Sequence, residues 1–131
     1  MSWRWVNRQA LLLLHAESTA EHGGAAGLRD AGLLDSALAR AQNLVAYSHP
    51  DRQPDYAQLA AAYGFGLAKN HAFVDGNKRA AFLATGLFLA LNGYRLTATQ
   101  ADATLTVLAL AAGEIDETAF ANWIRERSVK R

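Results

Sequence analysis

The distribution of proline is the feature that most constrains the fold of this chain. The 131 residues include two prolines, Pro50 and Pro54, and both fall in one short stretch. Because proline breaks helix interiors, the rest of the chain is free to form long helices. Apolar residues recur at spacings of three and four on both sides of that stretch, which is typical of helices. The pattern predicts an all-α protein with an exposed loop at residues 47–55.

Capping signals divide the remaining chain into about six helices. We expect helices at residues 7–21 (ended by Gly23-Gly24), after the N-cap Asp30, at 56–69 after Asp55, at 77–91 (ended by Asn92-Gly93), between Thr99 and Gly113, and after Asp116. Thr99 and Asp102 form a weak capping box, and residues 94–97 form a short extended link. Basic residues in the last turn favour a helix C-terminus, and this pattern extends the last helix toward the chain end through Arg125, Arg127, Lys130 and Arg131.

The fourth expected helix is apolar nearly all round, from Ala80 to Leu91, which is typical of a helix at the centre of a core. We therefore predict a compact bundle of about six helices around a central hydrophobic helix, in a single domain over residues 1–131.

Composition excludes several classes of function. The net charge is +1, which gives no strong electrostatic footprint, and with no basic stripe in the sequence no direct nucleic-acid binding is expected. The chain has no cysteine, which excludes disulfides and thiolate chemistry. The apolar runs are too short for a signal peptide or a membrane span, so we expect a cytoplasmic protein without membrane contact.

A dense polar cluster precedes the apolar helix. Residues 71–79 read HAFVDGNKR and combine a base, an acid, a glycine, an amide and two cations. Helix N-termini leave backbone N–H groups unpaired and favour negative charge, so this position suits a phosphate group. The cluster lacks the glycine spacing of a Walker A loop and of a kinase glycine-rich loop. It indicates an enzyme that acts on a nucleotide.

Each ionisable residue of the cluster has a functional and a structural interpretation. His71 can accept a proton from an attacking hydroxyl group, or it can cap helix carbonyls. Asp75 can bind Mg²⁺ together with phosphate oxygens, or it can serve as a plain N-cap. Lys78 and Arg79 oppose the helix dipole in the first turn, which favours anion binding over a solvated surface.

The remaining residues of the cluster shape the loop. Gly76 allows the backbone to approach a ligand closely. Asn77 can cap the helix, or orient a phosphate oxygen and the loop. We expect Phe73 to anchor the loop in the core. Whether His22 lines the site is open from the sequence, and a structural role for it is favoured. A structural zinc site is not expected.

The cluster resembles the signature of the Fic superfamily, H-x-F-x-D-G-N-G-R. It is most similar to the form found in death-on-curing (Doc) toxins, where lysine replaces the second glycine. The similarity extends to residues 21–24, 27–30, 33–38 and 88–94, and so to most of the chain.

This resemblance implies a six-helix fold with ATP and Mg²⁺ as co-substrate and cofactor. His71 would be the general base, Asp75 would hold Mg²⁺, and Gly76, Asn77, Lys78 and Arg79 would bind phosphates. The loop at residues 47–55 would take the place of the flap that clamps a target segment in Fic proteins.

Lys78 bears on the chemistry that the resemblance implies. A lysine fills part of the space that holds the α-phosphate in Fic adenylyltransferases, whereas Doc toxins phosphorylate a threonine of elongation factor Tu. We therefore expect a toxin that transfers the γ-phosphate and arrests translation. The alternatives are a Fic-type adenylyltransferase, which transfers AMP, and a non-catalytic module that only binds an antitoxin.

Many Fic proteins carry an inhibitory helix with the pattern [ST]-x-x-x-E-[GN]. No serine or threonine of this chain is followed by that pattern. The resemblance then implies a separate antitoxin, whose disordered tail folds as it binds the toxin.

Overall fold

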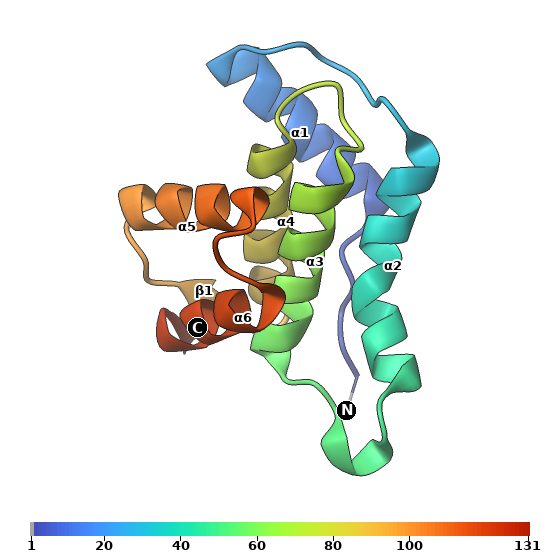
Figure 1. Ribbon diagram of the computed structural model, residues 1–131, viewed down its shortest axis with the longest axis vertical. Helices are drawn as coiled ribbons and strands as arrows, with labels where there is room; N and C mark the ends of the chain where they lie inside the picture. The colour runs from blue at the N-terminus through green and yellow to red at the C-terminus, as the bar shows by residue number, and fades with distance from the viewer. Residues whose placement is uncertain (1) are drawn as a thin grey trace.

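The computed structural model describes residues 2–131, and over these residues it confirms the predicted all-α architecture (Figure 1). The six α-helices are α1 (Arg8–His22), α2 (Ala31–Tyr47), α3 (Tyr56–Asn70), α4 (Asn77–Leu91), α5 (Gln100–Ala112) and α6 (Glu117–Glu126). A short 3-10 helix, η1 (Pro50–Arg52), and two strands, β1 (Tyr94–Leu96) and β2 (Ser128–Lys130), complete the described elements.

Side-chain caps start five of these helices where the sequence predicts them. Asp30, Asp55, Thr99 and Asp116 each accept a hydrogen bond from a backbone N–H three residues ahead, as does Asn7 at the start of α1. Helix α3 starts with a complete capping box, because the Gln58 side chain also accepts a hydrogen bond from the Asp55 N–H. These caps stabilise the helix starts by about 1 kcal/mol each.

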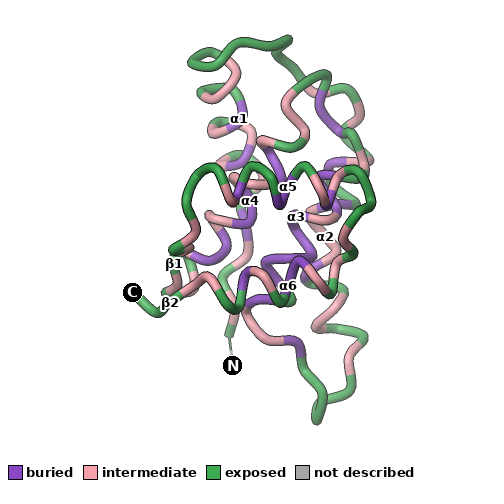
Figure 2. Tube along the Cα trace, turned by 60° about the vertical axis from the view of Figure 1, so that its left-hand side comes forward, coloured by how far each residue is buried: buried purple, intermediate pink, exposed green. Residues whose placement is uncertain are grey.

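The centre of the bundle is α3 rather than the predicted α4. Ten of the 15 residues of α3 are buried, against six of the 15 residues of α4. Alanine and glycine make up much of α3, and these small residues let α2, α4 and α6 approach it closely. A run of alanines gives a weaker hydrophobic signal than the leucines and phenylalanines of α4, which explains why the sequence pointed to the wrong helix. Figure 2 shows the buried segments gathered around these two helices.

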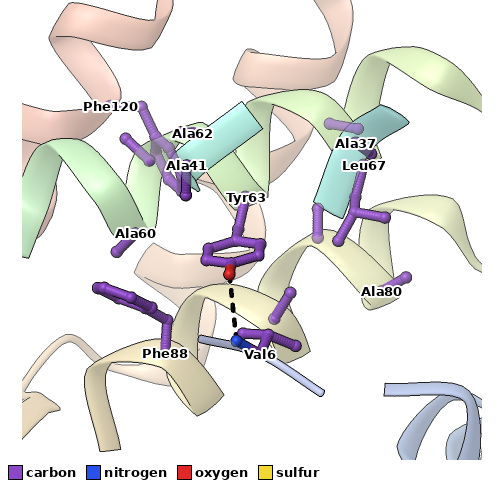
Figure 3. Close-up of a cluster of buried hydrophobic side chains, with 14 of the residues drawn as sticks. Val6, Ala37, Ala41, Ala60, Ala62, Tyr63, Leu67, Ala80, Phe88 and Phe120 are labelled. Atoms are coloured by element: carbon purple, nitrogen blue, oxygen red, sulfur yellow. Dashed lines mark hydrogen bonds between the residues drawn. The ribbon is translucent and has the colours of Figure 1, made fainter. Parts of the chain in front are cut away.

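The core is one cluster to which every helix contributes. It includes Leu11, Leu34, Leu67, Phe88, Leu110 and Ile124, all fully buried. Tyr63 of α3 lies within this cluster, and its hydroxyl oxygen accepts a hydrogen bond of 3.1 Å from the Val6 N–H (Figure 3). The segment that precedes α1 is thereby fixed to the central helix.

The prediction that the last helix continues toward the chain end is wrong. Helix α6 ends at Glu126, and Ser128–Lys130 forms strand β2, which pairs antiparallel with β1. Residues 94–97, predicted as an extended link, supply the partner strand. Arg125 in the last turn and Arg127 at the C-cap do lie at the C-terminus of α6, as expected, and Arg127 also forms an ion pair with Asp102 at 2.8 Å.

The expectation that residues 47–55 act as a flap over the polar cluster is also wrong. This loop precedes α3 and the cluster follows it, so the two lie at opposite ends of the molecule (Figure 1). A 15-residue helix is about 22 Å long, which separates the loop from His71. The segment beside the cluster is instead the connection between α1 and α2.

Candidate functional site

Residues 71–76 form the loop between α3 and α4, which we call the motif loop. His71 ends α3 in the left-handed conformation, with φ 53° and ψ 48°, and is exposed. Histidine tolerates this conformation better than most residues do. Gly76 also has a positive φ, 75°, and starts α4. Two left-handed residues thus turn the chain sharply between two antiparallel helices.

The connection between α1 and α2 holds the motif loop along one edge. Leu28 and Phe73 form an antiparallel bridge, and the Val74 N–H donates to the Gly27 carbonyl oxygen at 3.1 Å. The Arg29 side chain donates from Nε to the His71 carbonyl oxygen at 2.8 Å. Phe73 is 2% exposed, which confirms that it anchors the loop in the core.

Asn77 orients the motif loop from within. Its side-chain oxygen accepts from the Phe73 N–H at 2.9 Å, and its side-chain nitrogen donates to the Phe73 carbonyl oxygen at 3.0 Å. Of the roles that the sequence left open for Asn77, the structure shows the orientation of the loop.

The N-terminus of α4 is open to an anion. The N-cap is Gly76, which has no side chain to pair with the first-turn N–H groups, and the first turn holds no acidic residue. Asp75 is therefore not the N-cap, contrary to its structural interpretation. Unpaired N–H groups together with the adjacent Lys78 give this helix end a positive potential that suits phosphate.

Asp75 lies between the motif loop and the α1–α2 connection. Its carboxylate accepts from the Gly76 N–H at 2.8 Å and from the Ala25 N–H at 3.3 Å. Gly24 fits against it closely, since a Cβ atom at residue 24 would lie 2.8 Å from Asp75 Oδ2. The carboxylate is exposed and held by backbone groups, so a cation can still reach its free lone pairs.

Arg79 points toward α1. Its Nε donates to Ser18 Oγ at 3.1 Å, and its terminal nitrogen lies 3.3 Å from His22 Nε2. Since arginine can only donate, His22 is the acceptor in this contact. Whether His22 lines the site was open from the sequence; it lies four residues after Ser18, one turn along the same face of α1, and borders the smaller of the cavities described below.

The predicted residues line three neighbouring cavities, one of them shared by Lys78 and Arg79, and the other two meet at the motif loop. A cavity of about 850 Å³ toward α5 is lined by His71, Asp75, Gly76, Asn77 and Lys78, with Leu105, Leu108 and Glu114 opposite. A smaller cavity of about 190 Å³ toward α1 is lined by His15, Ser18, His22, Asp75, Gly76 and Arg79. Asp75 and Gly76 border both cavities. A ligand with several phosphate groups could therefore contact Lys78 and Arg79 from the two sides of the motif loop.

The residues present fit a magnesium ion that shares its coordination with phosphate. Mg²⁺ binds one or two carboxylates and completes its shell with phosphate oxygens and water. Asp75 provides one such carboxylate beside the open N-terminus of α4. Within residues 2–131, no group of three or more histidine and carboxylate side chains could hold a metal without a ligand's help.

Sequence reasoning missed the contributions of α1 to the site. His15, Ser18 and His22 recur at spacings of three and four, so they share one helix face. That polar stripe could have been noticed, but its partners, Asp75 in the motif loop and Arg79 on α4, lie about 60 residues away. Periodicity shows which residues face the same way and does not show what they face.

Comparison of the sequence with known proteins identifies a family and a similar protein. The sequence model of the Fic/DOC family matches residues 5–89. A protein from Mycolicibacterium smegmatis (strain ATCC 700084 / mc(2)155), named Toxin Doc, is 50% identical over 76 residues. That match covers 58% of this chain and 57% of the relative, so the chain spans little more than half the length of the relative it matches. Because the family match covers most of the chain, including the polar cluster and the helices that carry it, the chain belongs to the Fic/DOC family.

Proposed function

We propose that this protein is the toxin of a type II toxin–antitoxin system and that it transfers the γ-phosphate of ATP to a threonine hydroxyl of elongation factor Tu, arresting translation. The observation that carries the proposal is the position of Lys78. It lies in the first turn of α4, is exposed, and lines the same cavity as His71 and Asp75. A lysine there adds charge and bulk beside the helix end, where a glycine would leave an open anion site.

His71 is the proposed general base. Its exposed side chain lines the larger cavity, and no described residue forms a hydrogen bond to its ring. The ring nitrogen takes the proton of the target hydroxyl as that oxygen forms a bond to the γ-phosphorus atom. The bond from the γ-phosphorus to the bridging oxygen breaks, and ADP leaves with the electron pair.

Charge neutralisation is the second proposed contribution of the site. Lys78 and the open first-turn N–H groups of α4 bind the phosphate chain on one side, and Arg79 binds it on the other. Asp75 would hold Mg²⁺, which neutralises phosphate charge when bound. Asn77 keeps the motif loop in the shape that these contacts need.

The proposed partners follow from the same family. The similar protein from Mycolicibacterium smegmatis is named a toxin, which supports the role of toxin for this chain. An antitoxin with a disordered tail that folds on binding would restrain it. No helix among residues 2–131 has the length and apolar character needed to cross a membrane. Action on a translation factor would place the protein in the cytoplasm.

The experiment is a labelling assay on the purified protein with elongation factor Tu, Mg²⁺ and ATP labelled at either the α or the γ position. We expect label from γ-labelled ATP alone. His71→Asn is the test variant, because asparagine tolerates the left-handed backbone of residue 71, so its effect reports on the base and not on strain. We expect it to lower transfer by at least 100-fold, within the range for general-base catalysis.

The outcomes separate the proposed chemistry from its alternatives. Transfer from α-labelled ATP would establish adenylylation and reject the kinase. No transfer from either label, with the antitoxin removed, would reject elongation factor Tu as the target and favour a binding role. Transfer that persists in His71→Asn would reject His71 as the base while leaving the reaction itself in place.

A further inference from the structure

His15 is a buried histidine that the proposed reaction does not use. It lies on α1, is 4% exposed, and borders the smaller cavity. Burying a polar ring is unfavourable unless its polar atoms find partners. The contacts of this ring therefore indicate what it does for the molecule.

Two contacts join His15 to the motif loop. Its Nε2 lies 2.8 Å from the carbonyl oxygen of Asp75. Since a carbonyl oxygen can only accept, Nε2 carries the proton and donates. The ring also stacks on Phe73, with centroids 3.8 Å apart and planes 21° apart. Helix α1 thus contacts the motif loop at Phe73, near its middle, and at Asp75, near its end.

The hydrogen bond falls at the point where the loop turns into α4. Gly76 follows the bonded carbonyl and has a left-handed backbone, and a Cβ atom there would lie 3.1 Å from His15 Nε2. The peptide group between Asp75 and Gly76 therefore cannot rotate without breaking the hydrogen bond to His15. Its orientation sets both the direction of the Asp75 carboxylate and the start of the open helix end.

We propose that His15 is a positioning residue, whose Nε2–H bond to the Asp75 carbonyl fixes the turn that aims the Asp75 carboxylate and the α4 N-terminus at a bound phosphate chain. This inference rests on the proposed function for the identity of the ligand. The predicted effect of His15 on the motif loop is independent of the proposed function, because it can be measured without any substrate.

The test compares two substitutions of similar size. In His15→Gln the side-chain amide can still donate near the position of Nε2, whereas in His15→Met no donor remains. His49→Met is the matched control, because His49 is an exposed histidine in the loop at the opposite end of the molecule. Should His15→Met fail to fold, His15→Asn replaces it, since its shorter amide stops before the Asp75 carbonyl.

The first readout is hydrogen exchange of backbone amides by NMR. We expect the Phe73, Val74 and Gly76 amides of the loop, which donate to Asn77, Gly27 and Asp75 respectively, to exchange at least tenfold faster in His15→Met. Amides inside α3 should be unchanged. His15→Gln and His49→Met should stay within about threefold of the wild-type protein at every site.

The second readout is steady-state phosphate transfer. A positioning role predicts that His15→Met lowers kcat at least tenfold while the KM for the protein target changes less than twofold, with recovery in His15→Gln. A merely structural role would lower the amount of folded protein and leave the kcat of the folded fraction unchanged.

Equal behaviour of His15→Gln and His15→Met in both readouts would overturn the proposal, as would unchanged loop exchange in both. If the wild-type protein transfers no phosphate, the proposed function fails, and hydrogen exchange alone still decides whether His15 fixes the turn.

Discussion

At the scale of single residues, buried polar side chains form hydrogen bonds that fix separate segments of the chain to one another. Tyr63 is an example outside the site. Burial raises the pKa of its phenol above the usual value, although the hydrogen bond from the Val6 N–H acts in the opposite direction. The hydroxyl oxygen is the partner that the structure provides for this N–H, which is itself buried in the core.

Substitution Tyr63→Phe should therefore lower the free energy of unfolding by about 1 to 3 kcal/mol, because it leaves the buried Val6 N–H without its acceptor. Urea denaturation followed by circular dichroism measures this value. Tyr47→Phe is the control, since Tyr47 is 87% exposed and should change stability by no more than about 0.5 kcal/mol. Equal effects of the two substitutions would contradict the assigned role of the bond.

The same tyrosine gives the protein a dependence on alkaline pH. A folded-state pKa above the unfolded value means that its contribution to stability is complete below about pH 10 and decreases as the pH rises further. Wild-type protein should lose stability above pH 10 more steeply than Tyr63→Phe, which has no phenol to ionise. Denaturation curves at pH 9 and above would show parallel slopes if Tyr63 played no part.

At the scale of elements, helix starts could be predicted from sequence because their signals are local. An N-cap needs only the residue itself and the N–H groups two or three positions ahead, so Asp30, Asp55, Thr99 and Asp116 were recognised without a structure. Strand β2 could not be recognised in this way. Its partner is β1, with Tyr94 opposite Lys130, and three residues carry too little pattern to reveal a pairing across that distance.

In the candidate site, too, features that are local in sequence could be predicted and contacts between distant segments could not. Residues 71–79 identified the motif loop and the helix that follows it, because a chemical signature is contiguous in sequence. The residues of α1 that complete the smaller cavity are joined to α4 only in three dimensions. Lys78 and Arg79, adjacent in the first turn of α4, share one cavity against α5, and each also borders a second cavity beside the motif loop.

Asp55 permits an experiment on a whole element, because one side chain both caps α3 and pairs with α6. Arg125 donates to its two carboxylate oxygens at 2.8 and 3.0 Å. Burial alone would raise the pKa of this carboxyl, but the bonds from Arg125, Gln58 and Ala57 outweigh it and hold the pKa below its usual value. The stability that Asp55 contributes is therefore present above the unfolded pKa and is lost as the pH falls through the folded pKa.

Substitution Asp55→Ala should lower the free energy of unfolding at pH 7 by about 1 to 2 kcal/mol, mainly through the lost cap, since the half-exposed ion pair is worth less than about 1 kcal/mol. Asp55→Asn should retain most of the cap and lose the dependence on acidic pH. Thermal unfolding between pH 2 and 7 tests both variants, and an acid dependence that Asp55→Asn preserves would rule out this carboxyl as its source.

At the scale of the whole molecule, α3 acts as a spacer between two loops with different roles. The residues at its C-terminal end belong to the motif loop and contact α1, α4 and the α1–α2 connection. The loop at its N-terminal end is exposed over Pro50–Arg52 and lies far from these residues (Figure 1). Sequence order places both loops next to α3, and only the length of the helix shows that they cannot meet.

Insertions in the two segments that lie beside the opposite ends of α3 should therefore differ in their effect on phosphate transfer. Four residues of glycine and serine added between Asp51 and Arg52 should leave phosphate transfer within about twofold of wild type, because lengthening an exposed loop costs less than about 1 kcal/mol. The same insertion between Ala25 and Ala26 should lower transfer at least tenfold, since the Ala25 N–H holds the Asp75 carboxylate and Gly24 packs against it. Thermal unfolding of both variants checks that they remain folded. Greater loss from the insertion at residue 51 would contradict the conclusion that the loop containing Pro50 and Pro54 lies away from the site, whereas loss only from the insertion at residue 25 would support the role of the α1–α2 connection in holding Asp75.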